Sequence, residues 1–431
     1  MKYIISLIII FASTISFNCS DNSKNDDTVT VTFWHSFVAS TIPAFNELIE
    51  KFESENPGIK INAQYVPTGD ALVQKLVTAV QSNSAPDISW LHSDFISKLV
   101  EADAIYPMNH FINSENGLTD EEMNDIFPQL LQAASWRDTL YAMPMEATVL
   151  ALLYNKDMLK AAGYSSPPAN WNELHEYARN LTIDSDKDGV PEQYGFYIPA
   201  YPASGPLSIW MVLQWTPYLW QAGGSEINNN QTQVLFNSDA GVKALTLWKT
   251  IYNDVRFNNF SMTHDMGFTS GTIAMIMDGP WDLPQLKKLV KFNWGITSLP
   301  EGPEKKATYL AGESMAIFRQ SKNPDAAWTF VKWIVKPENQ AFFSERSGYL
   351  PVCKSVLEME DYQNYLNRDP LMKAFVDQME IGFARATIDY NRVEINQNIA
   401  AAIEKAIIGN VDPKTALDEA AQKCNILLNN R

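Results

Sequence analysis

Cysteine, histidine and positive charge are all scarce in this chain. Its 431 residues include 3 Cys and 5 His, and 33 Lys and Arg stand against 50 Asp and Glu, so the formal net charge is −17. Three cysteines cannot build a disulfide scaffold, and their spacing fits no metal site; Cys353 and Cys424 are either a pair or two buried free thiols. The acidic surplus makes nucleic acids and anionic membrane surfaces poor partners.

Long apolar runs are also missing, except at the N-terminus. Met1 and Lys2 give a positive start, and residues 3–17 are apolar apart from small hydroxyls. This pattern predicts a signal peptide over residues 1–18, because the apolar core is too short for a membrane-spanning helix.

Cys19 follows that core directly and precedes a polar tether that ends at residue 27. It resembles the cysteine of bacterial lipoproteins, which is lipidated and becomes the new N-terminus, although Ser16-Phe17-Asn18 departs from the pattern preferred before that cysteine. We therefore expect an extracytoplasmic protein, in the periplasm or at the cell surface, that is held to a membrane only by lipid on Cys19. Ordinary cleavage without a lipid is the alternative.

Strand and helix patterns alternate along the rest of the chain, which is long enough for two domains. Residues 28–33 form a β-branched strand, residues 42–52 have helical apolar spacing, and residues 59–66 form a second strand. Such alternation predicts a mainly parallel sheet with ligands beyond the carboxyl ends of its strands. We also expect helices over residues 210–220, 238–252, 326–335, 395–408 and 415–428, and strands over residues 271–277, 293–299 and 314–318.

A series of short motifs runs through nearly the whole chain in a family-specific order. The chain resembles the family 1 extracellular solute-binding proteins of ABC importers, which include maltose-, oligosaccharide- and glycerol-phosphate-binding proteins. The motifs are Val31-Thr32-Phe33-Trp34-His35, Ala85-Pro86-Asp87-Ile88, Leu153-Tyr154-Asn155-Lys156-Asp157, Trp171-Asn172-Glu173-Leu174, Gly271-Thr272-Ile273-Ala274-Met275, Gly279-Pro280-Trp281 and Ser347-Gly348-Tyr349-Leu350-Pro351.

This resemblance implies a two-lobed, periplasmic-binding-protein-like α/β fold, with mixed, mainly parallel sheets flanked by helices. A ligand cleft is expected between the lobes, which a hinge joins and which close around the ligand. We expect an N-terminal lobe from residues 28–145 plus 307–350, and a C-terminal lobe from residues 146–306 plus 351–431.

The resemblance also implies ligand-binding residues. Glu146, in Met145-Glu146-Ala147, resembles the glutamate with which maltose-binding proteins bond sugar hydroxyls; an exposed hinge charge is the alternative. Trp281 resembles the family's tryptophan that stacks on a sugar ring. Asp94 lies where maltose-binding proteins place a ligand aspartate, but it could equally cap a helix.

Further binding candidates follow from the same comparison of motifs. Family members contact ligand at the end of the first strand, here at Trp34 and His35. Segments that cross between the lobes often line the cleft, which adds Gly312, Glu313 and Tyr349 to the list. Arg385 falls where several members offer an arginine, although a surface ion pair would also explain it.

Asp184, Asp186 and Asp188 alternate ahead of Gly189, as at the start of an EF-hand calcium loop. The twelfth position is Gly195, where such a loop needs a bidentate glutamate. We expect a turn here, with calcium as the alternative and no other metal or cofactor.

These observations predict a monomeric receptor, not an enzyme, that binds a di- or oligosaccharide and delivers it to the transmembrane subunits of an ABC permease. A glycerol phosphate is the competing ligand, but it calls for Arg, Lys or backbone N–H donors, whereas Asp94 and Glu146 would repel it. A glycosidase that uses these two carboxylates and an adhesin for host glycans are alternatives of other classes.

Overall fold

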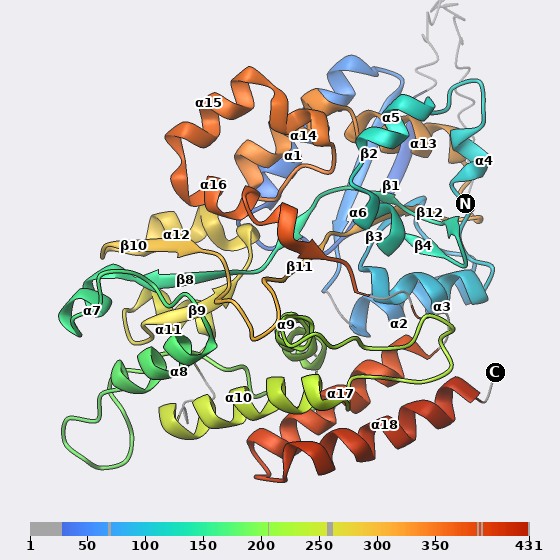
Figure 1. Ribbon diagram of the computed structural model, residues 1–431. Coiled ribbons are helices and arrows are strands. Elements are labelled where there is room, and N and C mark those ends of the chain that lie inside the picture. The colour runs from blue at the N-terminus through green and yellow to red at the C-terminus, as the bar shows by residue number, and fades with distance from the viewer. Residues whose placement is uncertain are drawn as a thin grey trace, which may run out of the picture.

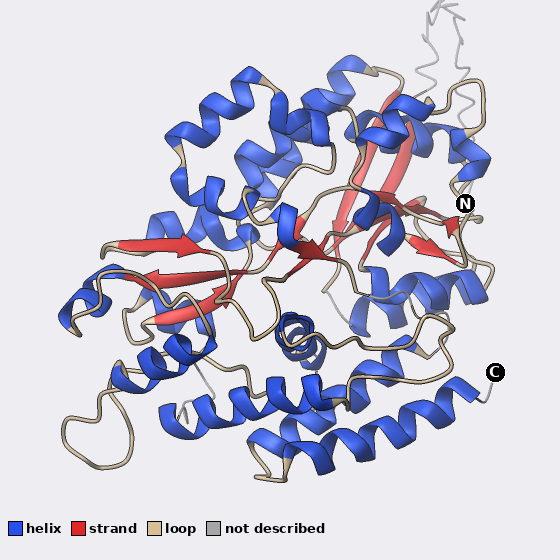
Figure 2. Cartoon of the chain, in the orientation of Figure 1, coloured by secondary structure: helices blue, strands red, loops and turns tan. Residues whose placement is uncertain are grey.

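The computed structural model describes residues 28–67, 70–205, 207–256, 262–385, 388 and 391–429. The expected signal peptide, Cys19 and its tether lie outside these ranges. The strands form separate groups in two α/β lobes, with a small sheet between them (Figures 1 and 2). This arrangement confirms the expected two-lobed α/β fold. Among the helices that the structure describes, none is both long and apolar enough to cross a membrane.

The first lobe is organised around a five-stranded sheet in the order β2-β1-β3-β12-β6. β1 pairs in parallel with β2 and β3, as the alternating pattern predicts, and β12 pairs antiparallel with β3 and β6. The apolar stripe of α1 is buried, and its members are Ala44, Phe45, Leu48, Ile49 and Phe52. The strands are β1 (Val29–His35), β2 (Ile59–Tyr65), β3 (Ile88–Leu91), β6 (Met143–Pro144) and β12 (Ser314–Ile317), with the separate hairpin β4 (Ser135–Trp136) and β5 (Thr139–Leu140). The helices are α1 (Ile42–Glu55), α2 (Asp70–Gln81), η1 (Ser93–Phe95), α3 (Ile96–Glu101), α4 (Asn109–Ile112), α5 (Asp120–Asp125), α6 (Pro128–Ala133), α13 (Pro324–Ile334) and α14 (Pro337–Ser347).

The second lobe contains a three-stranded sheet in the order β10-β8-β9, and both of its pairs are antiparallel. The expectation of mainly parallel sheets is therefore wrong for this lobe. β8 leads away from the first lobe, so its antiparallel neighbour β9 runs back and ends at Asp278, just before Gly279-Pro280-Trp281. The strands are β8 (Ala151–Asn155), β9 (Met275–Asp278) and β10 (Trp294–Thr297). The helices are α7 (Lys156–Ala161), α8 (Trp171–Asn180), α9 (Ser208–Gln221), α10 (Asp239–Val255), α11 (His264–Thr269), η2 (Pro280–Asp282), α12 (Leu283–Leu289), α17 (Arg392–Ile407) and α18 (Pro413–Asn429).

A small sheet lies between the lobes, where the chain passes from one to the other. β7 (Thr148–Val149) pairs antiparallel with β11 (Thr308–Ala311), which pairs in parallel with β13 (Gly382–Phe383). A third connecting segment, at Leu350, lies beside this sheet. The N–H of Ala147 donates to the carbonyl of Leu350 (2.8 Å), and the N–H of Leu350 donates to the carbonyl of Ala147 (2.8 Å).

The chain beyond residue 350 does not leave the first lobe at once. Cys353 forms a β-bridge with Ile126, and the N–H of Ser355 donates to Asp125 (2.8 Å). The chain just beyond residue 350 therefore still contacts the first lobe, whereas α16 packs on β10 of the second lobe. The connecting elements are η3 (Lys354–Glu358), α15 (Glu360–Arg368), α16 (Pro370–Val376) and η4 (Met379–Ile381).

Cys353 and Cys424 are both free and buried. Of the two alternatives that the sequence leaves open, the structure therefore has two separate thiols. Burial raises the pKa of the Cys424 thiol to about 12.

Candidate functional site

A cavity of about 350 Å³ lies where the two lobes and their connecting segments meet. Trp90, His92 and Phe95 line it from the first lobe, at and just beyond the carboxyl end of β3. Most of its other rings come from the second lobe and from the connecting segments: Tyr201, Trp210, His264, Trp281, Tyr309 and Tyr349. Asp265 and Glu313 supply carboxylates, and among the described residues no Lys or Arg lines this cavity.

Trp281 lines the cavity together with Trp210. Their rings meet edge to face, with centroids 5.4 Å apart and an angle of 73°. Trp281 lies in η2, directly beyond β9, and its ring lies over Gly279, where a Cβ would come within 1.9 Å of it. Gly279 is therefore required for this ring position. The half-buried indoles give the cavity an apolar wall of the kind that stacks on flat or weakly polar ligand faces.

Glu313 and Tyr349 reach the cavity from the connecting segments, as expected. Gly312 permits this arrangement, because a Cβ on it would lie 1.7 Å from the carbonyl oxygen of Glu146. The N–H of Met145 donates to the carbonyl of Glu313 (2.9 Å), and this bond links the two connecting segments that contain these residues. Gly312 therefore brings the chains close together, and Glu313 supplies the side chain that lines the cavity.

Glu146 lies behind this wall and does not line the cavity. Its side chain is fully buried, and Oε1 accepts a hydrogen bond from Trp90 Nε1 (3.0 Å). Burial, followed by the neighbouring Glu313, raises the pKa of Glu146 well above its usual range. The alternative of an exposed hinge charge is wrong, because Glu146 is a buried carboxyl that accepts a hydrogen bond from Trp90.

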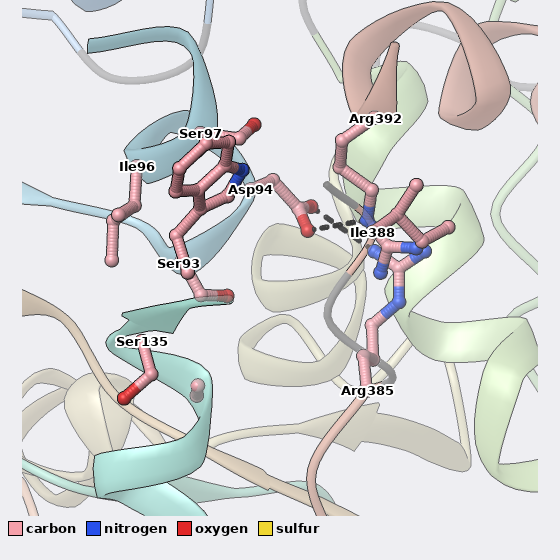
Figure 3. Close-up of a pocket in the computed structure, with 10 residues that line it drawn as sticks. Ser93, Asp94, Ile96, Ser97, Ser135, Arg385, Ile388 and Arg392 are labelled. Atoms are coloured by element: carbon pink, nitrogen blue, oxygen red, sulfur yellow. Dashed lines mark hydrogen bonds and ion pairs between the residues drawn. The ribbon is translucent and has the colours of Figure 1, made fainter. Parts of the chain in front are cut away.

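Asp94 and Arg385 lie together in a buried cluster beside a small cavity of about 20 Å³ (Figure 3). Arg392 Nε donates to Asp94 Oδ1 (2.8 Å), and Arg385 Nη1 donates to Asp94 Oδ2 (3.1 Å). Arg385 Nε also donates to Glu226 Oε1 (3.1 Å), and Asn396 Nδ2 donates to Asp94 Oδ2 (3.0 Å). The carboxylate and both guanidinium groups are almost fully enclosed, so the surface ion pair considered for Arg385 is wrong.

This cluster is neutral overall and internally paired. Burial alone would raise the pKa of Asp94, but Arg392 and Arg385 outweigh it and hold that pKa well below its usual range. The helix cap considered for Asp94 is not its main role either, because both carboxylate oxygens accept from side chains. The cluster joins η1 of the first lobe to α17.

Trp34 and His35 do not line the large cavity, which instead reaches the next residue, Ser36. Trp34 Nε1 donates to Gln64 (3.1 Å), and His35 packs against Phe37 and Phe45, with ring centroids 5.4 and 5.1 Å away. Burial lowers the pKa of His35 to about 4, so this histidine is neutral.

The sequence reasoning missed several residues that line the cavity. Trp90 and His92 belong to the same segment as Asp94, and Trp210 begins the aromatic part of α9. Their position near expected strand or helix ends is the signal that could have found them. Tyr201 and His264 follow irregular or short segments, and no local pattern points to them.

The carboxylates of Asp184, Asp186 and Asp188 come together in the expected turn. Backbone N–H groups occupy much of their bonding capacity: Gly189 donates to Asp184 (3.2 Å) and Val190 donates to Asp188 (2.7 Å). The turn is therefore stabilised by its own side chains, and calcium there stays the alternative that the sequence leaves open.

Comparison with known proteins places this architecture in a family. The profile of the bacterial extracellular solute-binding proteins matches residues 47–374, more than half of the chain. A protein of Brucella abortus (strain 2308), named only as a binding protein, is 26% identical over 401 residues, with 91% of each chain covered. The sn-glycerol-3-phosphate-binding periplasmic protein UgpB of Shigella dysenteriae (strain Sd197) is 23% identical and covers 93% of this chain and 92% of its own.

Solved structures share the same fold. The cyclic alpha-maltosyl-1,6-maltose binding protein from Arthrobacter globiformis superposes with a TM-score of 0.79 at 24% identity, and covers 94% of this chain and 100% of its own. The lobes, the interlobe cavity and the matched profile agree, and the chain belongs to the family of bacterial extracellular solute-binding proteins.

Proposed function

We propose that the protein is an extracytoplasmic receptor that binds a neutral carbohydrate in the interlobe cavity and delivers it to an ABC-type permease. The observation that carries this proposal is the lining of the cavity, which combines aromatic rings with carboxylates. Trp281 and Trp210 offer faces for the apolar side of a sugar ring, while Glu313 and Asp265 can accept hydrogen bonds from hydroxyl groups. A volume of about 350 Å³ suits a small ligand such as a disaccharide.

A glycerol phosphate is the second candidate, since the Shigella relative is named for that ligand. A phosphate dianion is usually held by Arg, Lys or a row of N–H donors. The described lining of the cavity instead presents two carboxylates and no Lys or Arg. The arginines Arg385 and Arg392 are already committed to Asp94 and Glu226. Sugar is therefore the better match in charge.

The test is a thermal-shift screen of mono-, di- and oligosaccharides together with glycerol phosphates, followed by calorimetry on the best hit. Ligand binding raises the melting temperature by mass action. We expect a sugar hit, and a loss of at least about tenfold in affinity for Trp281→Ala, since burial and stacking of an aromatic ring together contribute about 1.4 kcal/mol or more.

Trp294→Ala is the matched control. Trp294 is also a half-buried tryptophan of the second lobe, but it packs on Phe268 (ring centroids 6.0 Å apart) and does not line the cavity. The affinity of the Trp294→Ala variant for the sugar hit should stay within about twofold of that of the wild type. A glycerol phosphate as the sole hit, or equal effects of both variants, would contradict the proposed ligand and site.

The same proposal includes three further points. The receptor catalyses no reaction, Cys19 carries a lipid, and the protein delivers its ligand as a monomer. Glycosidase activity is checked with a panel of chromogenic glycosides, and turnover that Glu146→Gln abolishes would favour an enzyme. An adhesin is distinguished by binding intact host glycans more tightly than free sugars.

A further inference from the structure

A cluster of side chains of the types that bind metal ions lies where the second lobe borders the cavity. His264 begins α11, Asp278 ends β9, and Asp282 closes η2 four residues later. One ligand atom from each of these three residues lies within 4.8 Å of the other two. Two segments of the chain, α11 and the consecutive elements β9 and η2, thus bring an imidazole and two carboxylates to one point.

The cluster is not satisfied by its own contacts. Asp278 is fully buried, and its Oδ1 accepts from the N–H of Gly279 (2.8 Å). Within the described part of the chain, Asp278 Oδ2 and both ring nitrogens of His264 have no hydrogen-bond partner. Asp278 Oδ2 lies 3.4 Å from His264 Nε2, which is an ion-pair distance. A buried carboxylate oxygen without a hydrogen bond is costly, and this one is directed at the imidazole inside the cluster.

The charges around the cluster are predominantly negative. Burial, followed by Asp278, raises the pKa of Asp282 to about 8. Burial opposes protonation of His264, but Asp278, Asp282 and Asp265 together raise its pKa to about 9. The carboxyl groups of Asp278 and Asp282 therefore face one imidazole at a single point, an arrangement that a bound cation would stabilise.

We propose that His264, Asp278 and Asp282 bind a divalent transition-metal cation of the Zn²⁺ type. One imidazole nitrogen with two carboxylate oxygens is a ligand set that suits Zn²⁺, whereas Mg²⁺ and Ca²⁺ favour oxygen ligands alone. Three protein ligands leave at least one coordination position open. His264 also lines the large cavity next to Trp281, so a ligand hydroxyl in the cavity could reach such a cation.

The test uses tag-free, EDTA-treated protein titrated with ZnCl₂ in calorimetry, with bound metal counted by mass spectrometry. No sugar is present, so the outcome is independent of the proposed carbohydrate function. We expect one equivalent of Zn²⁺, a higher melting temperature with Zn²⁺, and no saturable binding of MgCl₂ at this site.

His264→Gln and Asp278→Asn should each weaken Zn²⁺ binding by at least about tenfold, because even the loss of a group that only orients a ligand costs about 10- to 100-fold. Asp186→Asn, in the exposed acidic turn, is the control and should bind as the wild type does. If Asp278→Asn does not fold, as judged by circular dichroism in EDTA, Asp282→Asn replaces it. Absence of saturable binding, full affinity in a folded ligand variant, or loss of binding in Asp186→Asn would overturn the proposal.

Discussion

At the scale of single residues, the carboxyl groups of Glu146 and Glu313 illustrate how burial decides the chemistry of a side chain. Glu146 is fully enclosed and accepts from Trp90, whereas Glu313 is half-buried and lines the cavity. The raised pKa of Glu146 favours its neutral form, so the two acids can lie close together without two adjacent buried charges. Glu146 thus fixes the ring of Trp90 in the cavity wall, and Glu313 is the acid available to a ligand.

Glu146→Gln tests this protonation through the pH dependence of stability. Because the pKa of Glu146 is raised in the folded protein, its contribution to stability is fully present below the unfolded value of about 4.5 and is lost as pH rises. Glutamine has no such loss. We therefore expect the free energy of unfolding of the variant, relative to wild type, to rise above pH 5 by up to about 1.4 kcal/mol per pH unit. Urea denaturation at pH 5, 6 and 7 measures it.

Glu50→Gln, on the exposed side of α1, is the control for this experiment. Its stability difference from wild type should not follow the same trend with pH. A flat difference for Glu146→Gln would mean that Glu146 is ionised in the folded protein, and the account of the Glu146–Glu313 pair would be wrong.

The sequence could predict which residues line the cavity better at some positions than at others, for a physical reason. Trp281 and Glu313 follow motifs or glycines that fix the backbone at a strand end, so their side chains have little choice of direction. Trp34 and His35 also end a strand, but Trp34 donates to Gln64 and His35 packs against Phe37 and Phe45, so the cavity reaches only the next residue, Ser36. Asp94 and Arg385 depend on partners about 290 residues apart, which no local pattern reveals.

At the scale of secondary-structure elements, the Asp94 cluster links η1 of the first lobe to α17 near the end of the chain. Figure 3 shows the Asp94 carboxylate directed at both arginines, which come from either side of residue 388. Glu226, which follows α9, completes the neutral set. A fully buried pair of this kind contributes little when intact, but removal of one partner leaves an uncompensated charge.

Asp94→Asn should therefore destabilise the protein by about 3–5 kcal/mol, measured by urea denaturation at pH 7, because two buried guanidinium groups would then share one carboxylate. Asp103→Asn is the control, since Asp103 pairs with Arg319 at 2.9 Å with its side chain 84% exposed, and a surface pair adds little. A ligand contact would behave differently: the variant would lose affinity for the sugar hit and keep its stability.

Most elements of the fold follow from local patterns, but their pairing does not. The apolar spacing predicts α1 and the aromatic helix α9, and the β-branched run predicts β1, each within a few residues of the observed bounds. The antiparallel direction of β8 and β9 depends on how the chain crosses between lobes, which strand patterns alone do not encode. That direction is what brings Asp278 and Trp281 to the cavity.

At the scale of the whole molecule, the cavity and the connecting segments lie in the same place. The lining residues come from both lobes and from the connecting segments. β7 contributes Thr148 to the cavity wall and β11 contributes Tyr309, and Glu313 follows β11. A ligand that contacts both lobes stabilises the arrangement in which they are close together. Binding should therefore be felt in the backbone of the connecting segments.

Hydrogen exchange can detect this coupling with the sugar hit at 100 times its dissociation constant. Ligand that binds only the closed arrangement stabilises it by about 2.7 kcal/mol, so amides that exchange through opening should slow by about 100-fold. We expect this protection in peptides that cover β7 and β11, in peptides with Trp90 and in peptides with Trp281.

Peptides of α18 serve as the internal control, because α18 does not line the cavity. Trp281→Ala should show protection that is weaker by at least about tenfold at the same sugar concentration, because its expected affinity is lower by that factor. Protection confined to one lobe would mean that the ligand does not bridge the lobes, because a ligand bound to one wall alone cannot shift the equilibrium between open and closed arrangements.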